Sequence, residues 1–327
     1  SVMYLTMLHS SMVQFWQPQL SWQRLQHPTL GRQQPEIWIC QLETGSNAVS
    51  GNKILKLRYT LELALQQKKV GVFTFGGAFS NHLAAVAEAC QRLGLTSTAY
   101  VRTDKLDSNN PTLAYCAKRG MTLIALDRSS YRQRNDTDFL AQLQLRHPHL
   151  MAVPEGGSSL VGAAGIGDIN FADTPAGTAG LVCCATASGG TLAGLIANPL
   201  MPADTKILGF SVVKDSSLPQ RIMQLLPAQC STRQWQLNGD FIGAGYARFD
   251  TELLNFCRDM AQQQVFVEPV YTGKALYALV QLVAQQKLSA RRISFFHTGG
   301  LQGLQGLHYR KLITAADLAL LSGSKAD

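Results

Sequence analysis

Lys53 is the residue of this chain that is most clearly placed for chemistry. It follows the turn-forming run Ser50-Gly51-Asn52 and opens a segment whose apolar side chains recur at helical spacing as far as Leu65. The positive end of a helix dipole repels a lysine, and Lys56 adds a second cation in the same first turn. We therefore expect an anion beside these amines. The alternative is a pair of solvated surface lysines, which is the usual state of this residue type.

A second polar group stands at the start of the next helical segment. Residues 76–82 read GGAFSNH and follow an apolar run, which places Ser80, Asn81 and His82 at a helix N-terminus. Backbone N–H groups and the helix dipole attract a carboxylate at such a position. The alternative is that Ser80 or Asn81 only caps the helix.

A glycine-rich turn at residues 187–194, ASGGTLAG, also joins a strand to a helix. Ser188, Gly189, Gly190 and Thr191 offer hydroxyls and closely approachable backbone donors, a combination that suits a phosphate. The turn lacks the lysine of a Walker loop and the full dinucleotide-binding glycine spacing, so a nucleotide is disfavoured. Similar turns also occur in α/β proteins without any ligand.

Two further residues are expected at the same edge of the sheet. Tyr271 precedes a helix and Thr298 follows the last strand, and ligands of open parallel sheets bind beyond the carboxyl ends of the strands. Tyr271 is a candidate for proton handling or ring contact, although a tyrosine is often a half-buried core residue. The lysine, the phosphate cradle, the carboxylate site and this neutral hydroxyl together match pyridoxal 5′-phosphate.

The elements that must position these residues alternate between strands and helices. This order predicts a parallel α/β fold. The predicted strands are 35–40, 70–75, 96–101, 122–126, 181–184, 207–211 and 292–297. The predicted helices begin at 53 and at about 191 or span 81–93, 111–119, 250–262 and 273–286. We expect two lobes: a small one at 54–168 and a large one made of 1–53 and 169–327. The segment before residue 35 is predicted to be irregular.

Composition excludes several classes of protein. Hydrophobic residues make up 46% of the 327 positions and charged residues 15%, as in a compact globular protein with a large core. The net charge of +8 is scattered, so nucleic acid is not an expected partner. The seven cysteines form no C-x-x-C pair and predict buried thiols, and no metal site is expected. Without a signal-like or membrane-spanning stretch, we expect a cytoplasmic protein.

The ordered set of motifs resembles the fold type II, tryptophan-synthase-like pyridoxal-phosphate enzymes. The similarity is to the group of 1-aminocyclopropane-1-carboxylate deaminase and D-cysteine desulfhydrase, and it extends from about Trp38 to Leu304. It rests on seven motifs: residues 51–53, 76–82, 154–158, 188–194, 243–246, 269–274 and 297–300. The resemblance implies two open parallel-sheet lobes with the cofactor cleft between them, and a homodimer.

The resemblance also implies roles for individual residues. The Schiff-base lysine falls on Lys53. The cofactor-binding set implied by position is Lys53, Lys56, Asn81, Ser188, Gly189, Gly190, Thr191 and Thr298, with Thr298 facing the pyridine nitrogen. The implied catalytic set is Lys53, Ser80, Tyr246 and Tyr271, and the implied substrate-binding set is Ser80, Asn81, His82 and Thr272.

Two positions bear on the substrate. The ring-opening deaminases look to carry glutamine and glutamate where this chain has His82 and Thr272, which match the desulfhydrases. A hydroxyl at the ring nitrogen makes a weaker electron sink, which is adequate when a thiol leaves. The chain departs from the group at residues 40–44 and at Ala78-Phe79, both near the expected site.

The predicted reaction is therefore a lyase reaction on a small amino acid. Lys53 or a tyrosine removes the α-proton and the β-substituent leaves, so that D-cysteine would give pyruvate, sulfide and ammonia. The alternatives are 1-aminocyclopropane-1-carboxylate deamination, another elimination or a racemisation. A cofactor-binding protein without turnover and an unrelated α/β binding protein are the non-enzymatic alternatives.

Overall fold

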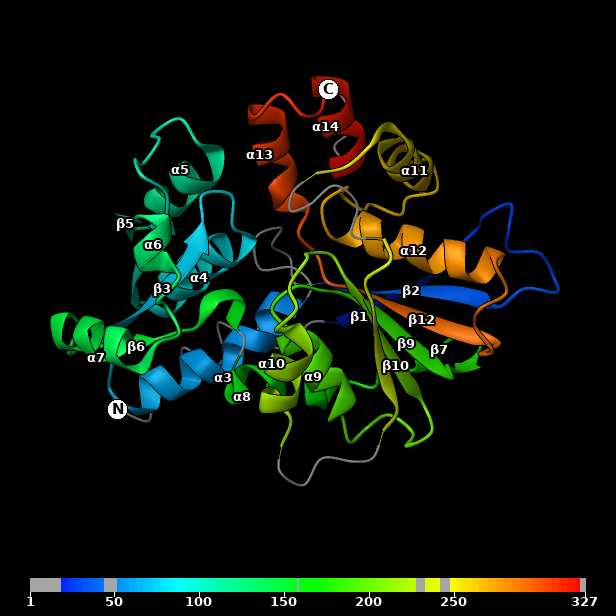
Figure 1. Cartoon of the computed structure of the whole chain (residues 1–327), viewed down its shortest axis with the longest axis horizontal. Helices are drawn as coiled ribbons and strands as arrows, with labels where there is room; N and C mark the ends of the chain where they lie inside the picture. The colour runs from blue at the N-terminus through cyan, green and yellow to red at the C-terminus, as the bar shows by residue number, and fades with distance from the viewer. Residues whose placement is uncertain (1–18, 44–51, 158, 228–232, 242–247, 324–327) are drawn as a thin grey trace.

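The computed structural model describes residues 19–43, 52–157, 159–227, 233–241 and 248–323, which form two main sheets flanked by helices (Figure 1). The larger sheet runs in the order β1 (Gln19–Arg24), β2 (Glu36–Glu43), β12 (Arg292–His297), β9 (Leu181–Thr186), β10 (Lys206–Ser211) and β11 (Trp235–Asn238). Its pairs are parallel except β1 with β2.

The smaller sheet is parallel throughout. Its order is β5 (Met121–Leu126), β4 (Thr96–Arg102), β3 (Gly71–Gly77) and β6 (Leu150–Ala152). A short antiparallel ribbon joins β7 (Asp173–Thr174) to β8 (Gly177–Thr178). The expected fold class, two open α/β lobes, is confirmed, and the first predicted strand does return to the larger sheet as β2.

The irregular start expected before residue 35 is wrong for residues 19–24. These residues form β1, which pairs antiparallel with β2 and places Trp22 opposite Cys40. Only Leu20 and Trp22 of this strand pack against the core, in the two-residue alternation of a strand with one buried face. The remaining residues of β1 are polar, and its conformation is set by the partner strand.

The helices follow the predicted positions closely and add several short ones. They are α3 (Asn52–Gln66), α4 (Asn81–Leu93), α5 (Pro111–Lys118), α6 (Arg128–Tyr131), α7 (Thr137–Arg146), α8 (Leu160–Ala164), α9 (Gly190–Ile196), α10 (Leu218–Leu225), α11 (Thr251–Gln262), α12 (Thr272–Ala284), α13 (Leu304–Tyr309) and α14 (Ala315–Ser322). Capping explains the sharp limits of α4: Ser80 accepts from the Leu83 amide at its start, and Gly94 ends it in the left-handed conformation.

The two faces of the larger sheet are both covered, which explains its continuous apolar strands. In β12, Phe296 belongs to the cluster that continues through α3 and α4 to the smaller sheet, whereas Phe295 faces the cluster under α11 and α12. Cys183 and Cys184 divide between the same two clusters. One continuous core therefore joins the two sheets and holds the segments between them.

The predicted state of the cysteines is confirmed where it is described. Six are buried and form no disulfide, and Cys230 lies outside the described residues. Across the described ranges, none of the helices has the length and hydrophobicity to cross a bilayer.

Candidate active site

A pocket of about 430 Å³ lies between the two sheets. Its wall includes residues at or just after the carboxyl ends of strands from both: Gly77 of β3, Arg102 of β4, Thr186 of β9, Val213 beyond β10 and Thr298 beyond β12. This is the position at which open α/β sheets bind ligands. The pocket is also large enough for a cofactor of moderate size.

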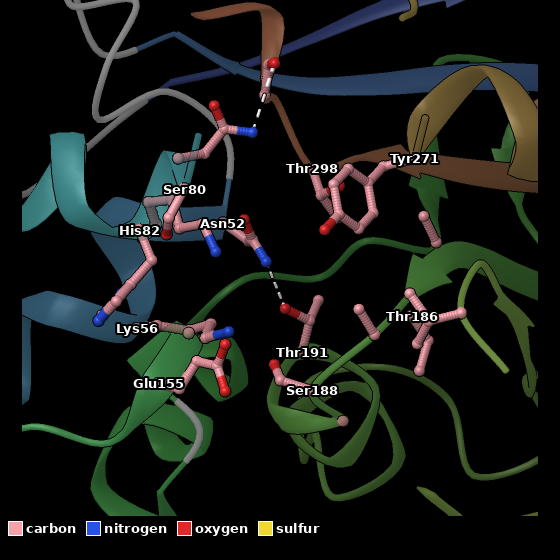
Figure 2. A pocket seen from close by; sticks show the side chains of 18 of the residues that line it. Asn52, Lys56, Ser80, His82, Glu155, Thr186, Ser188, Thr191, Tyr271 and Thr298 are labelled. Carbon is pink, nitrogen blue, oxygen red and sulfur yellow. Dashed lines mark hydrogen bonds between the residues drawn. The ribbon is translucent and has the colours of Figure 1, made fainter. Parts of the chain in front are cut away.

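Most of the residues singled out in the sequence meet in this pocket. It contains Lys53, Lys56, Ser80, Asn81, His82, Ser188, Gly189, Thr191, Tyr271 and Thr298. Figure 2 shows Ser80 and Tyr271 on opposite walls, with Ser188 and Thr191 between them at the bottom of the view.

Three of the expected residues are not brought to the pocket surface. Gly190 is buried as the first residue of α9 and does not line the pocket. Thr272 is buried, and its hydroxyl lies 3.1 Å from Glu268 Oε1 instead of facing the pocket. Tyr246 lies outside the described residues.

The two lysines of α3 give the pocket its main electrostatic feature. Burial lowers the pKa of Lys53 to about 8, and nearby Glu155 opposes this only in part. Lys56 is 2% exposed, and burial together with the Lys53 charge holds its pKa well below the ordinary value. Among the described residues, no carboxylate forms an ion pair with either amine. The pocket therefore offers a strong site for an anion.

The glycine-rich turn lies beside these amines. Gly189 has φ +93°, a conformation that L side chains rarely adopt, and a Cβ there would meet Ile222 of α10 at 2.9 Å. Asn52, the first residue of α3, donates to the Thr191 hydroxyl. The lysine segment and the glycine turn are thus held together by a direct hydrogen bond (Figure 2).

The start of α4 forms the opposite wall. Ser80 both caps the helix and lines the pocket, so the capping and the binding interpretation of this residue are compatible. The Oδ1 atom of Asn81 and the Nδ1 atom of His82 are buried without a hydrogen-bond partner among the described residues. Burial and the two lysine charges hold the pKa of His82 well below its ordinary value, so its ring is neutral.

Tyr271 is held by a carboxylate that the sequence analysis did not single out. Glu268 accepts from the backbone amides of Val270, Tyr271 and Thr272 at 2.7 to 3.1 Å. Burial raises the pKa of Glu268, although these amides act in the opposite direction. The signal for this residue was present in the sequence, because an acidic residue shortly before a helix commonly binds its first amides.

Two ion pairs at the pocket wall were also missed. Arg134 donates to Glu155 at 2.6 Å, and Arg221 pairs with Asp215. Arg134 lies beyond α6 and pairs with Glu155 beyond β6, whereas Arg221 lies within α10 and pairs with Asp215 beyond β10. No spacing in the sequence identifies either pair.

Comparison with known proteins decides the family. Residues 25–299 match the family model described as "Pyridoxal-phosphate dependent enzyme". The chain belongs to this family. Its members use pyridoxal phosphate, so the resemblance and the cofactor inferred from the sequence are both confirmed.

Two relatives of this family illustrate its range. The D-cysteine desulfhydrase of Salmonella choleraesuis is 30% identical over 305 residues, covering 85% of this chain and 90% of the relative. The bifunctional D-cysteine desulfhydrase/1-aminocyclopropane-1-carboxylate deaminase of Arabidopsis thaliana is 30% identical over 301 residues, which cover 82% of this chain and 73% of the relative. A solved structure titled as an ACC deaminase homologue shares the fold, with a TM-score of 0.74 and 23% identity over 93% of this chain and 98% of that one.

The pocket fits the cofactor of this family. Lys53 has a lowered pKa, which increases the fraction of neutral amine able to form a Schiff base with an aldehyde. The buried Lys56 amine and the hydroxyls and amides of the glycine turn provide a cationic, donor-rich place for a phosphate. The neutral hydroxyl of Thr298 lies at the carboxyl end of β12, across the pocket from Lys56 (Figure 2).

Proposed function

We propose that this chain is a pyridoxal-phosphate-dependent lyase that eliminates the β-substituent of a small amino acid, with D-cysteine as the favoured substrate. The observation that carries the proposal is the placement of Lys53, with its lowered pKa, in one pocket with the helix start at Ser80 and the neutral hydroxyl of Thr298. The names of both relatives given above include D-cysteine desulfhydrase.

In this proposal the cofactor is held by residues from both sheets. Lys53 binds it covalently. Its phosphate would be held by Lys56, Ser188, Gly189 and Thr191, with the buried Gly190 as part of the turn behind them, and Thr298 and Asn81 would contact its ring. The bound cofactor supplies an electron sink for the electron pair released at Cα. A hydroxyl partner makes this sink weaker than a carboxylate would, which suits a good leaving group such as a thiol.

The chain's own residues would then bind the substrate and move its proton. The substrate carboxylate is placed on the backbone donors at the start of α4, from Ser80 to His82. Neutral Lys53 removes the α-proton, and Tyr271 or Tyr246 assists. The Cβ–S bond breaks and sulfide leaves with the electron pair. Water then converts the released product to pyruvate and ammonia.

The second candidate is deamination of 1-aminocyclopropane-1-carboxylate, which the Arabidopsis relative's name includes. Opening a cyclopropane ring requires a stronger electron sink or an additional acid near the ring. Thr272 supplies no acid, and its hydroxyl is bonded to Glu268 away from the pocket. For this reason we place the desulfhydrase reaction first.

The test begins with the visible spectrum of the purified protein before and after borohydride reduction. A reduced cofactor adduct on the Lys53 peptide, located by mass spectrometry, and release of sulfide and pyruvate from D-cysteine would support the proposal. Lys53→Ala should abolish both, whereas the exposed Lys105→Ala is the matched control and should retain both. A protein that carries the adduct but releases no 2-oxo acid from either amino acid would contradict it.

Three further properties accompany the proposal. We propose domain limits at 1–53 with 169–327 and at 54–168, which is supported by the grouping of β3 to β6 in one sheet. We also propose a homodimer located in the cytoplasm. Gel filtration with light scattering tests the dimer, and localisation in the source cells tests the compartment.

A further inference from the structure

A second cavity of about 80 Å³ adjoins the proposed active site. The smaller cavity, here called the side pocket, lies beside the place proposed for the substrate, because the two cavities have six wall residues in common: Gly77, Phe79, Asn81, Arg102, Tyr271 and Gly300. Arg310 lines the side pocket but not the larger one, whereas Phe79 and Arg102 stand between the two. Its volume admits a group of a few non-hydrogen atoms.

The side pocket carries two arginine side chains that are not neutralised. Arg102 lies over the ring of Tyr131, with its guanidinium carbon 5.5 Å from the ring centroid, and Arg310 lies 5.1 Å from the centroid of Phe79. Across the described ranges, neither guanidinium forms an ion pair or a hydrogen bond. Stacking on a ring orients a guanidinium and leaves its N–H groups available for an anion.

The acidic groups nearby are already occupied. Glu155 is bonded to Arg134, and Asp215 to Arg221. Glu268, which borders the side pocket, accepts from three backbone amides. Asp107 accepts from the Tyr309 hydroxyl beside Arg310. The positive charge of Arg102 and Arg310 is therefore left for a ligand.

Phe79 is the residue that sets this arrangement. A Cβ on Gly306 of α13 would meet the Phe79 ring at 2.6 Å, so the glycine permits the close approach of ring and helix. The ring in turn stacks on Arg310. The resemblance drawn from the sequence sets Ala78-Phe79 apart from the usual residues of its group, which would make the side pocket particular to this chain.

We infer that the side pocket binds a second anionic group, so that the substrate is an amino acid whose side chain ends in a carboxylate, sulfonate or phosphate. The inference rests on the proposed function for the position of the substrate. It adds that the natural β-substituent is acidic, and that D-cysteine is a smaller substrate of the same site. The α-carboxylate at Ser80 and the side-chain anion at Arg102 and Arg310 would fix the two ends of the molecule.

The test compares two amino acids of nearly identical shape, aspartate and asparagine, as ligands of the holoenzyme. Each enantiomer is titrated while the visible spectrum and the heat of binding are recorded. We expect aspartate to bind about tenfold more tightly than asparagine, a ratio typical of a charge-assisted contact. Arg102→Gln and Arg310→Gln should each reduce this ratio several-fold while asparagine affinity stays within about twofold.

Arg128→Gln is the matched control. Arg128 is exposed, and it lies close to Arg102 in the sheet, two residues after Leu126, which pairs with Arg102. It should leave the ratio unchanged. Equal affinities, no binding of aspartate, or a ratio that neither arginine variant alters would overturn the inference. The proposed function is tested by a different measurement: it fails if D-cysteine gives no sulfide and pyruvate. The ratio of aspartate to asparagine affinity can be measured whether or not D-cysteine is a substrate.

Discussion

The Nε2 atom of His82 in α4 lies 2.8 Å from the Oγ1 atom of Thr74 in β3. The Thr74 hydroxyl donates its hydrogen to the Val153 carbonyl at 2.7 Å, so it must accept from His82, and the ring carries its proton on Nε2. The imidazole is therefore a fixed neutral group that ties the start of α4 to the smaller sheet. His82 acts on the substrate site through the position of this helix start.

Thr74→Val tests this relationship. The change keeps the shape of the side chain but leaves the buried His82 N–H and the Val153 carbonyl unpaired, which should lower the free energy of unfolding by about 1–3 kcal/mol. It should also raise KM for the amino acid more than it lowers kcat, because the carboxylate site shifts. Urea unfolding and steady-state kinetics measure both. Thr74→Ser keeps the hydroxyl and should behave like the wild type, so equal losses in both variants would contradict the interpretation.

Lys53 should react as an unusually acidic lysine. Burial disfavours its cation and lowers its pKa to about 8 in the protein without cofactor. Because the folded pKa is below the unfolded value, the folded chain releases this proton first, and the neutral amine accumulates as pH rises through about 8. Competitive acetylation of the apoprotein between pH 6 and 10, read by mass spectrometry, should show this midpoint, with the exposed Lys105 as the reference for reagent reactivity. A Lys53 profile still rising steeply at pH 10 would refute the lowered pKa.

Lys56→Met should leave the stability of the protein without cofactor unchanged or raised, but should weaken binding of the cofactor. Lys56 is 2% exposed and has no carboxylate partner among the described residues, so an apolar side chain of similar length removes a buried amine. We expect the apoprotein to be as stable as the wild type or more stable, by up to about 2 kcal/mol. We expect affinity for pyridoxal phosphate to fall at least about tenfold, because a charge-assisted contact with the phosphate is lost.

Urea unfolding of the apoprotein and a fluorescence titration with pyridoxal phosphate separate the two effects. Lys274→Met is a useful comparison, because Lys274 is also buried but lies near Glu268 and outside the pocket. That variant should lose stability without a comparable loss of cofactor affinity. A Lys56→Met protein with unchanged cofactor affinity would remove Lys56 from the proposed phosphate site.

The sequence predicted those features of the fold that depend on neighbouring residues. Helix α4 spans the predicted residues 81–93 and is capped by Ser80, one of the two residues expected to cap it. The residues beyond the strand ends meet in one pocket because parallel strands share an edge. The side chain of Thr272 could not be placed in the same way, since it depends on Glu268 folding back over the start of α12. The contact between Thr74 and His82 depends on packing between segments and has no periodic signal, and the alternation of Leu20 and Trp22 in β1 is too short to predict a strand by itself.

Arg233 shows how a remote residue supports the glycine turn. It is 5% exposed and donates to five backbone carbonyls, those of Ile196, Asn198, Met201, Pro202 and Thr205. These carbonyls belong to the end of α9 and to the segment that leads from it to β10. Since α9 starts at the glycine turn, Arg233 holds the far end of the element that carries the proposed phosphate site.

Arg233→Met should therefore destabilise the protein by about 3–5 kcal/mol, because it removes a buried cation and leaves several buried carbonyls without a donor. Affinity for pyridoxal phosphate should fall as well, since α9 loses its support. Arg291→Met is the control: Arg291 is exposed and donates to the single carbonyl of Gln33, so its loss should change stability by less than about 1 kcal/mol. If the two variants unfold at the same urea concentration, Arg233 does not have this structural role.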